Sequence, residues 1–304
     1  MCLWQFQAAA LRDYARKQGK TPWLVIRVDL TSVAKCGKKL PYLRTYNGIH
    51  GIHLVVMHVS LGKLSFPMGC EIYDPASTAT PIDHAVRLLS RMHPYHWGGF
   101  EHLVVMDAGF YSADVLDLLN WWGYTHVSIG AKANLRLRDG RKLRDAKQAE
   151  AVELDSLPGT TFYVAWVTLP RDGKRRRFYT LSTTRATAIT LTSRHKRRWL
   201  IESFFKSAKH DFGLQETRLR TKQAILNWLL LVWLSTSLAL FTQALHDKTK
   251  TKSPAWRLTL AQAAESIRDY LMPHWRSLRA LISSAKCPLA SRRFALIIEH
   301  GRGV

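Results

Sequence analysis

A strand–helix–strand unit near the middle of the chain constrains the fold most. Glu101–Met106 is a short apolar run typical of a strand, and Asp107 begins the turn that follows it. Ser112 can cap a helix that extends to Trp122, and His126–Ile129 is typical of a second strand. Such a unit predicts an α/β fold, and ligands of open α/β sheets bind at the carboxyl ends of the strands. Asp107 is expected at such an end.

Further strands precede this unit and extend the predicted sheet. Trp23–Leu30 is a β-rich run with Asp29 embedded near its end. Ile49–Ser60 and Lys63–Tyr73 are apolar runs separated by Leu61 and Gly62, which is typical of a hairpin. The sequence therefore predicts a mixed sheet that contains a hairpin and carries acidic residues among its strands.

The region after this sheet differs in character and divides the chain. Thr161–Leu169 and Phe178–Ser182 are typical of strands, and the cationic run Lys174–Arg177 lies at the turn between them. This pattern predicts a β-rich insertion with a basic hairpin tip. The expected parts are an N-terminal helical remnant, the core, the insertion, the rest of the core and a helical C-terminal region: residues 1–21, 22–130, 131–190, 191–245 and 246–304.

The charge of the chain favours an anionic partner. Its 304 residues include 45 Lys and Arg against 22 Asp and Glu, a net charge of +23. Positive side chains in such excess repel one another unless an anionic partner screens their charge. Nucleic acid is favoured as that partner because each neutralised phosphate releases counterions. Anionic membrane is the main rival. The four cysteines lie far apart, which disfavours a disulfide framework and is typical of a reducing cytosol.

One apolar stretch bears on the membrane alternative. Gln223–Leu245 carries no charge and is long enough to cross a bilayer. Polar residues such as Asn227, Thr236 and Gln243 interrupt it, and we interpret it as a helix buried in a globular core. No membrane is therefore expected as a partner. A basic membrane-associated protein is kept as a third hypothesis, behind the two functions given below.

Residues 192–213 are predicted to form one helix that carries Glu202 among cations. Thr192 or Ser193 can cap its N-terminus, and Gly213 can end it in a left-handed conformation. An apolar stripe would anchor the helix on a core: Ile201, Phe205, Ala208 and Phe212. A neighbouring face would carry residues spaced by three, four and seven positions: His195, Arg198, Glu202 and Lys209.

The surroundings of Glu202 allow two interpretations. Its cationic neighbours are Arg197, Arg198, Lys206 and Lys209. The simpler interpretation is a solvated basic face with internal ion pairs. The alternative is a metal ligand placed beside a polyanion, and the rest of the chain favours this alternative.

Asp29, Asp107 and Glu202 are the candidate catalytic and metal-binding residues. Each is expected at the same sheet or on a helix that packs across it. Carboxylate oxygens are the ligands that Mg²⁺ and Mn²⁺ prefer, and two such ions about 4 Å apart can serve both the attacking and the leaving oxygen in phosphoryl transfer. Each acid also has a structural alternative, namely a turn or a loop cap. Asp74 is the strongest competing acid because it also ends a strand, although Pro75 indicates a turn.

The order of these acids resembles a known family. Asp29, Asp107 and then Glu202 after a β-rich insertion resemble the RNase H-like DDE transposases of bacterial insertion sequences, and the chain looks like insertion sequence family four. That subgroup has the signature Tyr-(2)-Arg-(3)-Glu-(6)-Lys. Its spacing falls here on His195, Arg198, Glu202 and Lys209, so the Arg, Glu and Lys positions match and the Tyr position does not. The segments Asp107–Tyr111 and Phe212–Leu214 also resemble the family. The resemblance covers roughly residues 22–245.

The resemblance implies a fold and a set of roles. The fold would be an RNase H-like mixed sheet flanked by helices, with a β-rich insertion between the second Asp and the Glu. The three acids would bind two Mg²⁺ or Mn²⁺ ions and catalyse hydrolysis and strand transfer at the element's ends. The expected DNA-binding residues are His195, Arg198, Lys206, Lys209, Arg175 and Arg176. Trp166 is a candidate for stacking on a flipped base, against the alternative of a sheet-core tryptophan.

The implied partners are element-end DNA and target DNA, bound by a homodimer in the cytoplasm at the nucleoid. Two departures from the family matter. His195 replaces the signature Tyr, which would make its charge depend on pH. Only 28 residues precede Asp29, and the chain is expected to be a truncated copy. The alternative function is a DNA-binding protein with a degenerate, catalytically inactive core.

Overall fold

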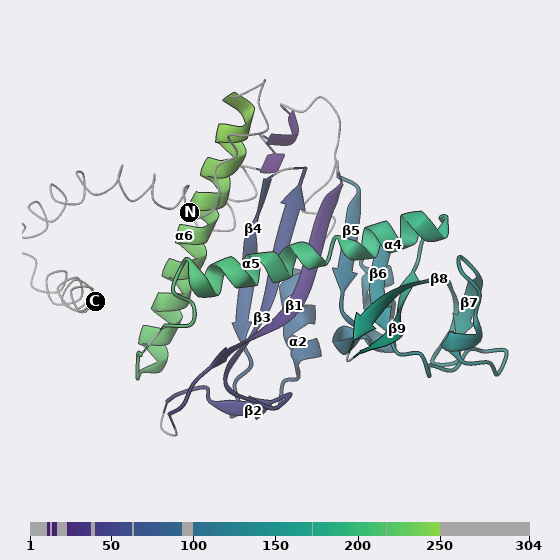
Figure 1. The fold of residues 1–304 in the computed structure, drawn as a ribbon, viewed down its shortest axis with the longest axis horizontal. Coiled ribbons are helices and arrows are strands. Elements are labelled where there is room, and N and C mark those ends of the chain that lie inside the picture. The colour runs from purple at the N-terminus through teal and green to yellow at the C-terminus, as the bar shows by residue number, and fades with distance from the viewer. Residues whose placement is uncertain are drawn as a thin grey trace, which may run out of the picture.

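The computed structural model describes residues 11–12, 14–16, 23–37, 40–62, 64–92, 100–171, 173–216 and 218–249. Within these ranges nine strands form one mixed sheet of order β2-β3-β1-β5-β6-β9-β8-β7, and β4 pairs with β3 (Figure 1). The strands are β1 (Leu24–Ala34), β2 (Arg44–Tyr46), β3 (Ile49–Leu61), β4 (Leu64–Ile72), β5 (His102–Met106), β6 (His126–Ala131), β7 (Ala151–Leu154), β8 (Leu157–Arg171) and β9 (Lys174–Ser182).

Helices cover both faces of the sheet. The α-helices are α2 (Pro81–Ser90), α3 (Ala113–Trp121), α4 (Ala188–Lys196), α5 (Trp199–His210) and α6 (Lys222–Thr249), and short 3-10 helices lie at η2 (Ala108–Phe110) and η3 (Leu143–Asp145). The apolar side chains of α2 and α3 pack with those of β1, β3 and β5 in one core, while α5 and α6 pack on the other face of β3. The predicted mixed sheet flanked by helices is confirmed.

The central strand is longer than predicted. β1 continues past Leu30 to Ala34 because it pairs antiparallel with β3 along its whole length. Its parallel partner β5 is shorter, and the last pair between them joins Val28 to Met106. Asp29 therefore lies in the middle of β1 and just beyond the end of its pairing with β5.

The insertion does not stand apart from the sheet. β9 pairs with β6 and carries β8 and β7 outward, so the strands of the insertion continue the sheet (Figure 1). The predicted basic hairpin is present, because β8 and β9 pair up to Arg171 and Lys174. The division into five parts stays a prediction. The helices expected after residue 249 lie outside the described residues.

The predicted single helix over 192–213 is wrong, and two helices take its place. α4 begins after its cap Thr187 and ends at Lys196, and α5 begins at Trp199. The two helices lie across one face of the sheet in Figure 1, with α5 over β1 and β3. The expected stop is correct, because Gly213 has a φ of 69° and the amide of Leu214 bonds back to the carbonyl of Ala208.

The apolar stretch after residue 222 is helical, as predicted, but it is buried on one side only. In α6, Ile225, Leu229 and Val232 are buried against the sheet. Leucines of its other side are exposed: Leu226, Leu230, Leu231, Leu234 and Leu238. Among the described residues this is the one helix long and apolar enough to cross a membrane, and 39% of its Lys222–Leu240 window is buried.

Candidate active site

Asp29 and Asp107 occupy equivalent positions on adjacent parallel strands. Each directly follows the last register pair of β1 and β5, Val28 and Met106, so the two carboxylates are neighbours across the strand pair. The Asp29 side chain is 13% exposed. The pKa of Asp29 is raised to about 6, because burial and, to a smaller extent, the charge of Asp107 outweigh the opposing charge of Arg198 and the amide hydrogen bond from Leu30.

Backbone packing places Asp107 at this end of the sheet. Asp107 directly precedes the short helix η2 without a side-chain capping hydrogen bond, and the backbone of Ala108 lies directly against Gly130 on β6. A Cβ atom at position 130 would lie 2.6 Å from the Ala108 nitrogen, which is closer than atoms pack. A side chain at Gly130 would therefore displace the segment that carries Asp107.

A buried arginine accounts for the break between α4 and α5. Arg27 on β1 is 2% exposed, and its Nε donates a hydrogen bond to the carbonyl oxygen of Arg197, the residue that caps the C-terminus of α4. A second nitrogen donates to Ser60 Oγ at 2.9 Å. This contact takes up the carbonyl of Arg197 and turns the next residue, Arg198, toward the sheet. Periodicity alone predicts no such contact.

Arg198 joins the first acid to the third. One of its terminal nitrogens donates to Asp29 Oδ2 at 2.7 Å, and the other donates to Glu202 Oε1 at 2.5 Å. Glu202 lies one turn into α5 and is 53% exposed. Burial lowers the pKa of Arg198, but the charges of Asp29, Asp107 and Glu202 outweigh burial and raise it. The three acids therefore surround one permanent cation.

The three acids have the donor chemistry of a Mg²⁺ or Mn²⁺ site. They offer hard oxygen ligands, and two of them already approach a common positive charge. Across the described ranges no three His, Cys, Asp or Glu side chains are grouped closely enough to hold a metal ion. Arg198 stands between two of the candidates. The three side chains are of the chemical type that binds such an ion, and their role as ligands stays a prediction.

His195 on α4 contacts polar side chains of the sheet. Its Nδ1 is 3.3 Å from Ser128 Oγ and 3.2 Å from Thr180 Oγ1, on β6 and β9. Burial and then the charge of Arg198 lower the pKa of His195 to about 4, against an opposing effect of Asp107. The imidazole is therefore neutral at physiological pH. Because α4 ends before Arg198, His195 also does not share a helix with Glu202, contrary to the predicted common face.

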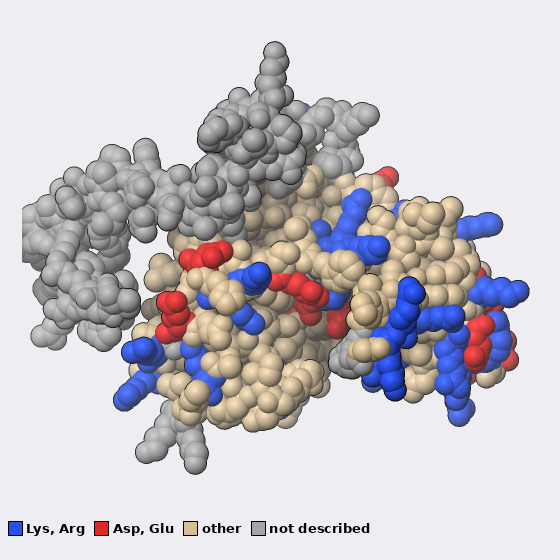
Figure 2. Space-filling model, in the orientation of Figure 1, with Lys and Arg blue, Asp and Glu red and all other residues tan. Residues whose placement is uncertain are grey.

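The other predicted DNA-binding cations divide into two groups. Lys206 and Lys209 lie on α5, the first exposed and the second half-buried, and burial lowers the pKa of Lys209. Arg175 and Arg176 are exposed on β9, separated from β1 in the sheet by β5 and β6. Figure 2 shows Lys and Arg gathered over the insertion and carboxylates near the centre of the same face. Two separate basic surfaces therefore flank the acids.

Trp166 contacts both a ring and a cation. Its ring centroid is 5.6 Å from that of Tyr179, and the Arg177 guanidinium lies 5.1 Å from the indole centroid. The indole is partly exposed on β8. Both predicted interpretations, packing on the sheet and stacking on a base, remain open.

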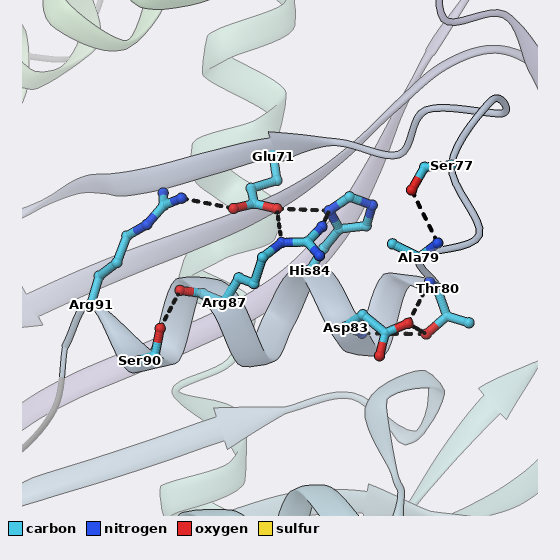
Figure 3. Close-up of polar contacts among 9 residues, drawn as sticks. All are labelled: Glu71, Ser77, Ala79, Thr80, Asp83, His84, Arg87, Ser90 and Arg91. Atoms are coloured by element: carbon cyan, nitrogen blue, oxygen red, sulfur yellow. Dashed lines mark hydrogen bonds and ion pairs between the residues drawn. The ribbon is translucent and has the colours of Figure 1, made fainter.

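A second charged cluster was not anticipated from the sequence. Glu71 on β4 accepts hydrogen bonds from His84, Arg87 and Arg91 on or next to α2 (Figure 3). Burial raises the pKa of Glu71, but these hydrogen bonds and charges outweigh burial and lower it. The three contacts of Glu71 join α2 and its C-cap to the sheet, so we interpret the cluster as structural.

Comparison with known proteins adds the family. The sequence model of the transposase DDE domain matches residues 23–238. The chain belongs to this family. The match spans Asp29, Asp107 and Glu202, as well as the insertion between the second and third acids. A search of curated protein sequences found no significant match.

Solved structures support the same fold. This transposase domain is similar to the piggyBac transposase in a synaptic complex with hairpin DNA, with a TM-score of 0.52 and 12% sequence identity. The match covers 87% of this chain and 58% of the piggyBac chain. The chain thus spans little more than half of that relative's length, and at this identity the likeness concerns the fold.

Proposed function

We propose that this DDE transposase domain acts on the ends of an insertion sequence of the family-four type. In this proposal it hydrolyses phosphodiester bonds and then transfers the freed strands. The observation that carries the proposal is that Arg198 bonds both Asp29 and Glu202, while Asp107 follows β5 in register with Asp29 on β1. The family membership supports transposition in general, and the DNA bound to the piggyBac relative supports DNA as the substrate.

The three carboxylates would hold two Mg²⁺ or Mn²⁺ ions. Bound ions would lower the pKa of the attacking water and stabilise charge on the attacked phosphate. Water, and later a 3′-hydroxyl, would attack a phosphodiester bond in line with the leaving oxygen. Asp29 and Asp107 are set by the sheet, whereas Glu202 is set by α5.

The basic residues would hold the DNA backbone. Lys206 and Lys209 on α5, with Arg198, would bind phosphates beside the acids. The neutral His195 would serve as a hydrogen-bond donor or acceptor and not as a charge. Arg175 and Arg176 on the insertion would bind phosphates farther along the duplex. A homodimer would bring two ends together during the reaction.

Metal-dependent nicking tests this function. The full chain is incubated with its flanking element-end DNA in Mg²⁺, Mn²⁺ or EDTA, beside Glu202→Gln and the control Glu216→Gln. Glu216 is an exposed glutamate in the turn after α5. We expect nicking at the element end with either metal, loss of nicking in Glu202→Gln by a factor of about 10³ or more, and retention in Glu216→Gln.

The alternative function predicts a different result. A DNA-binding protein with an inactive core would bind the element end equally well in EDTA and with metal, and the wild type would produce no nick. The presence of His195 where the signature has Tyr favours this alternative. DNA binding measured in the same samples separates it from a failure to bind at all.

A further inference from the structure

Arg198 occupies the position between two candidate metal ligands. Its side chain is as buried as that of Asp29, each being 13% exposed, and its two terminal nitrogens are used by different carboxylates. A guanidinium with two such partners holds them at one fixed separation. The positive charge between Asp29 and Glu202 is therefore supplied by a side chain of the protein, the guanidinium of Arg198.

A divalent ion and this guanidinium exclude each other. The Asp29 Oδ2 that accepts from Arg198 at 2.7 Å is also an oxygen that a metal ion would need. A metal ion at bonding distance from both acids would lie against the guanidinium, and like charges at that distance repel strongly in a half-buried site. Metal binding therefore requires Arg198 to leave.

Arg198 has a route outward and an alternative partner. Glu202 is 53% exposed, so the Arg198–Glu202 contact lies toward solvent, next to the cations of α5. Arg27 holds the backbone at the α4–α5 junction through the carbonyl of Arg197, so release of Asp29 would require only rotation of the Arg198 side chain. A phosphate offers the planar two-nitrogen fork the same bidentate geometry as a carboxylate.

We infer that Arg198 and divalent metal compete for Asp29 and Glu202, and that DNA phosphates relieve the competition by binding Arg198. This inference rests on the proposed function, since it takes the acids as metal ligands. It assigns Arg198 a positioning role that couples DNA binding to metal binding. Because such coupling is reciprocal, metal should also strengthen DNA binding through the same residue.

Metal binding without DNA tests the competition directly. Mn²⁺ is titrated into the full chain at pH 8 and free Mn²⁺ is followed by electron paramagnetic resonance, for wild type, Arg198→Gln and Arg197→Gln. Arg197 is the neighbouring, exposed cation, so its variant loses the same charge nearby. We expect Arg198→Gln to bind Mn²⁺ about tenfold more tightly than wild type, and Arg197→Gln to change by less than about threefold.

Several outcomes would overturn the inference. Equal or weaker Mn²⁺ binding by Arg198→Gln than by wild type overturns it and leaves the metal site in place. If wild type and Arg198→Gln both bind no more Mn²⁺ than Glu202→Gln does, the proposed metal site itself fails. Circular dichroism verifies that each variant folds. Arg198→Lys keeps the positive charge but loses the two-nitrogen fork, and its affinity for Mn²⁺ should lie between those of wild type and Arg198→Gln.

Added DNA gives the second readout. A short duplex of the element end should tighten Mn²⁺ binding by wild type more than by Arg198→Gln, in which the acids are already free. The direct contribution of phosphate to metal binding is common to both proteins and cancels in this comparison. An equal gain in both proteins would overturn the coupling through Arg198.

Discussion

At the scale of single residues, Asp29 is held where its charged form is disfavoured. Its burial outweighs the attraction of Arg198, and the pKa rises to about 6. A raised pKa means that the folded state binds the proton more tightly than the unfolded state. This contribution to stability is complete below the unfolded pKa near 4 and is lost as pH rises through about 6. Ionised Asp29 therefore costs stability at neutral pH.

Asp29→Asn should consequently stabilise the fold while it removes nicking. At pH 8 we expect the free energy of unfolding to rise by on the order of 2 kcal/mol, because the amide carries no charge to bury and still accepts from Arg198. At pH 4 the gain should be nearly absent. Urea unfolding at both pH values measures it, and a gain independent of pH would contradict the assigned burial of charge.

Arg27 is a second residue whose position serves the site. It is buried, and no carboxylate in the described part of the chain forms an ion pair with it; burial and then the charge of Arg197 lower its pKa to about 9. Its hydrogen bond to the carbonyl of Arg197 holds the junction from which Arg198 reaches Asp29. We interpret Arg27 as a positioning residue.

Arg27→Met should uncouple stability from nicking. Removing this buried charge, whose hydrogen-bond partners are neutral oxygens, should leave the free energy of unfolding within about 2 kcal/mol of wild type. Nicking should fall by about tenfold or more in kcat with little change in KM for DNA, because the α4–α5 junction shifts. Arg27→Lys, which keeps one donor, should restore part of kcat. A purely structural role would be indicated if Arg27→Met lost both stability and kcat and if Arg27→Lys recovered none of the lost kcat.

At the scale of elements, α6 has one side in the core and one side exposed. Leu229 is 5% exposed and Leu230 is 55% exposed, although they are neighbours in the same helix. The helix covers β3 and β4, and its exposed leucines continue along the opposite side. This asymmetry is a property of the packing and not of the composition, which is apolar all round.

The two leucines form a matched test of this arrangement. Leu229→Ala should lower the free energy of unfolding by about 2–4 kcal/mol, because it leaves a cavity against the sheet. Leu230→Ala should change it by less than about 1 kcal/mol. Urea denaturation of both variants measures the difference. Equal costs would show that the exposed side is covered in solution.

At the scale of the whole molecule, the described part of the chain exposes basic side chains on two surfaces. One lies on α5 beside the acids, and the other lies on the insertion, where Arg175 and Arg176 are exposed (Figure 2). With a net charge of +23, binding to DNA should weaken steeply with salt. The slope of that dependence counts the phosphates contacted.

Replacing both arginines tests the second surface. Arg175→Gln combined with Arg176→Gln should weaken DNA binding at every sequence and reduce the salt slope by about two. Arg138→Gln is the control, because this arginine lies in the same insertion but pairs with Glu153 at 2.7 Å. Fluorescence anisotropy across a salt series measures all three proteins. An unchanged slope in the double variant would place the DNA elsewhere.

The strands and turns were largely predictable from the sequence. Runs of β-branched and apolar residues mark β3, β4 and β5, and Gly62 and Gly213, both with positive φ, mark the ends of elements. The same reasoning placed Asp107 at the carboxyl end of a strand. These features depend on neighbours a few residues apart, and short-range patterns record such neighbours directly. The roles of the predicted DNA-binding residues and the division into domains stay predictions.

The sequence by itself determined the mixed α/β sheet, the acids at its strands and the basic character of the chain. Only the tertiary structure decided that α4 and α5 are separate, because the carbonyl that ends α4 is taken by Arg27, 170 residues earlier. It also decided that Arg198 joins Asp29 to Glu202. Arg198 lies 169 positions from Asp29 in the sequence and four positions from Glu202. Periodicity records which side of a helix a residue faces, whereas charge pairing across the fold depends on which distant backbone lies opposite.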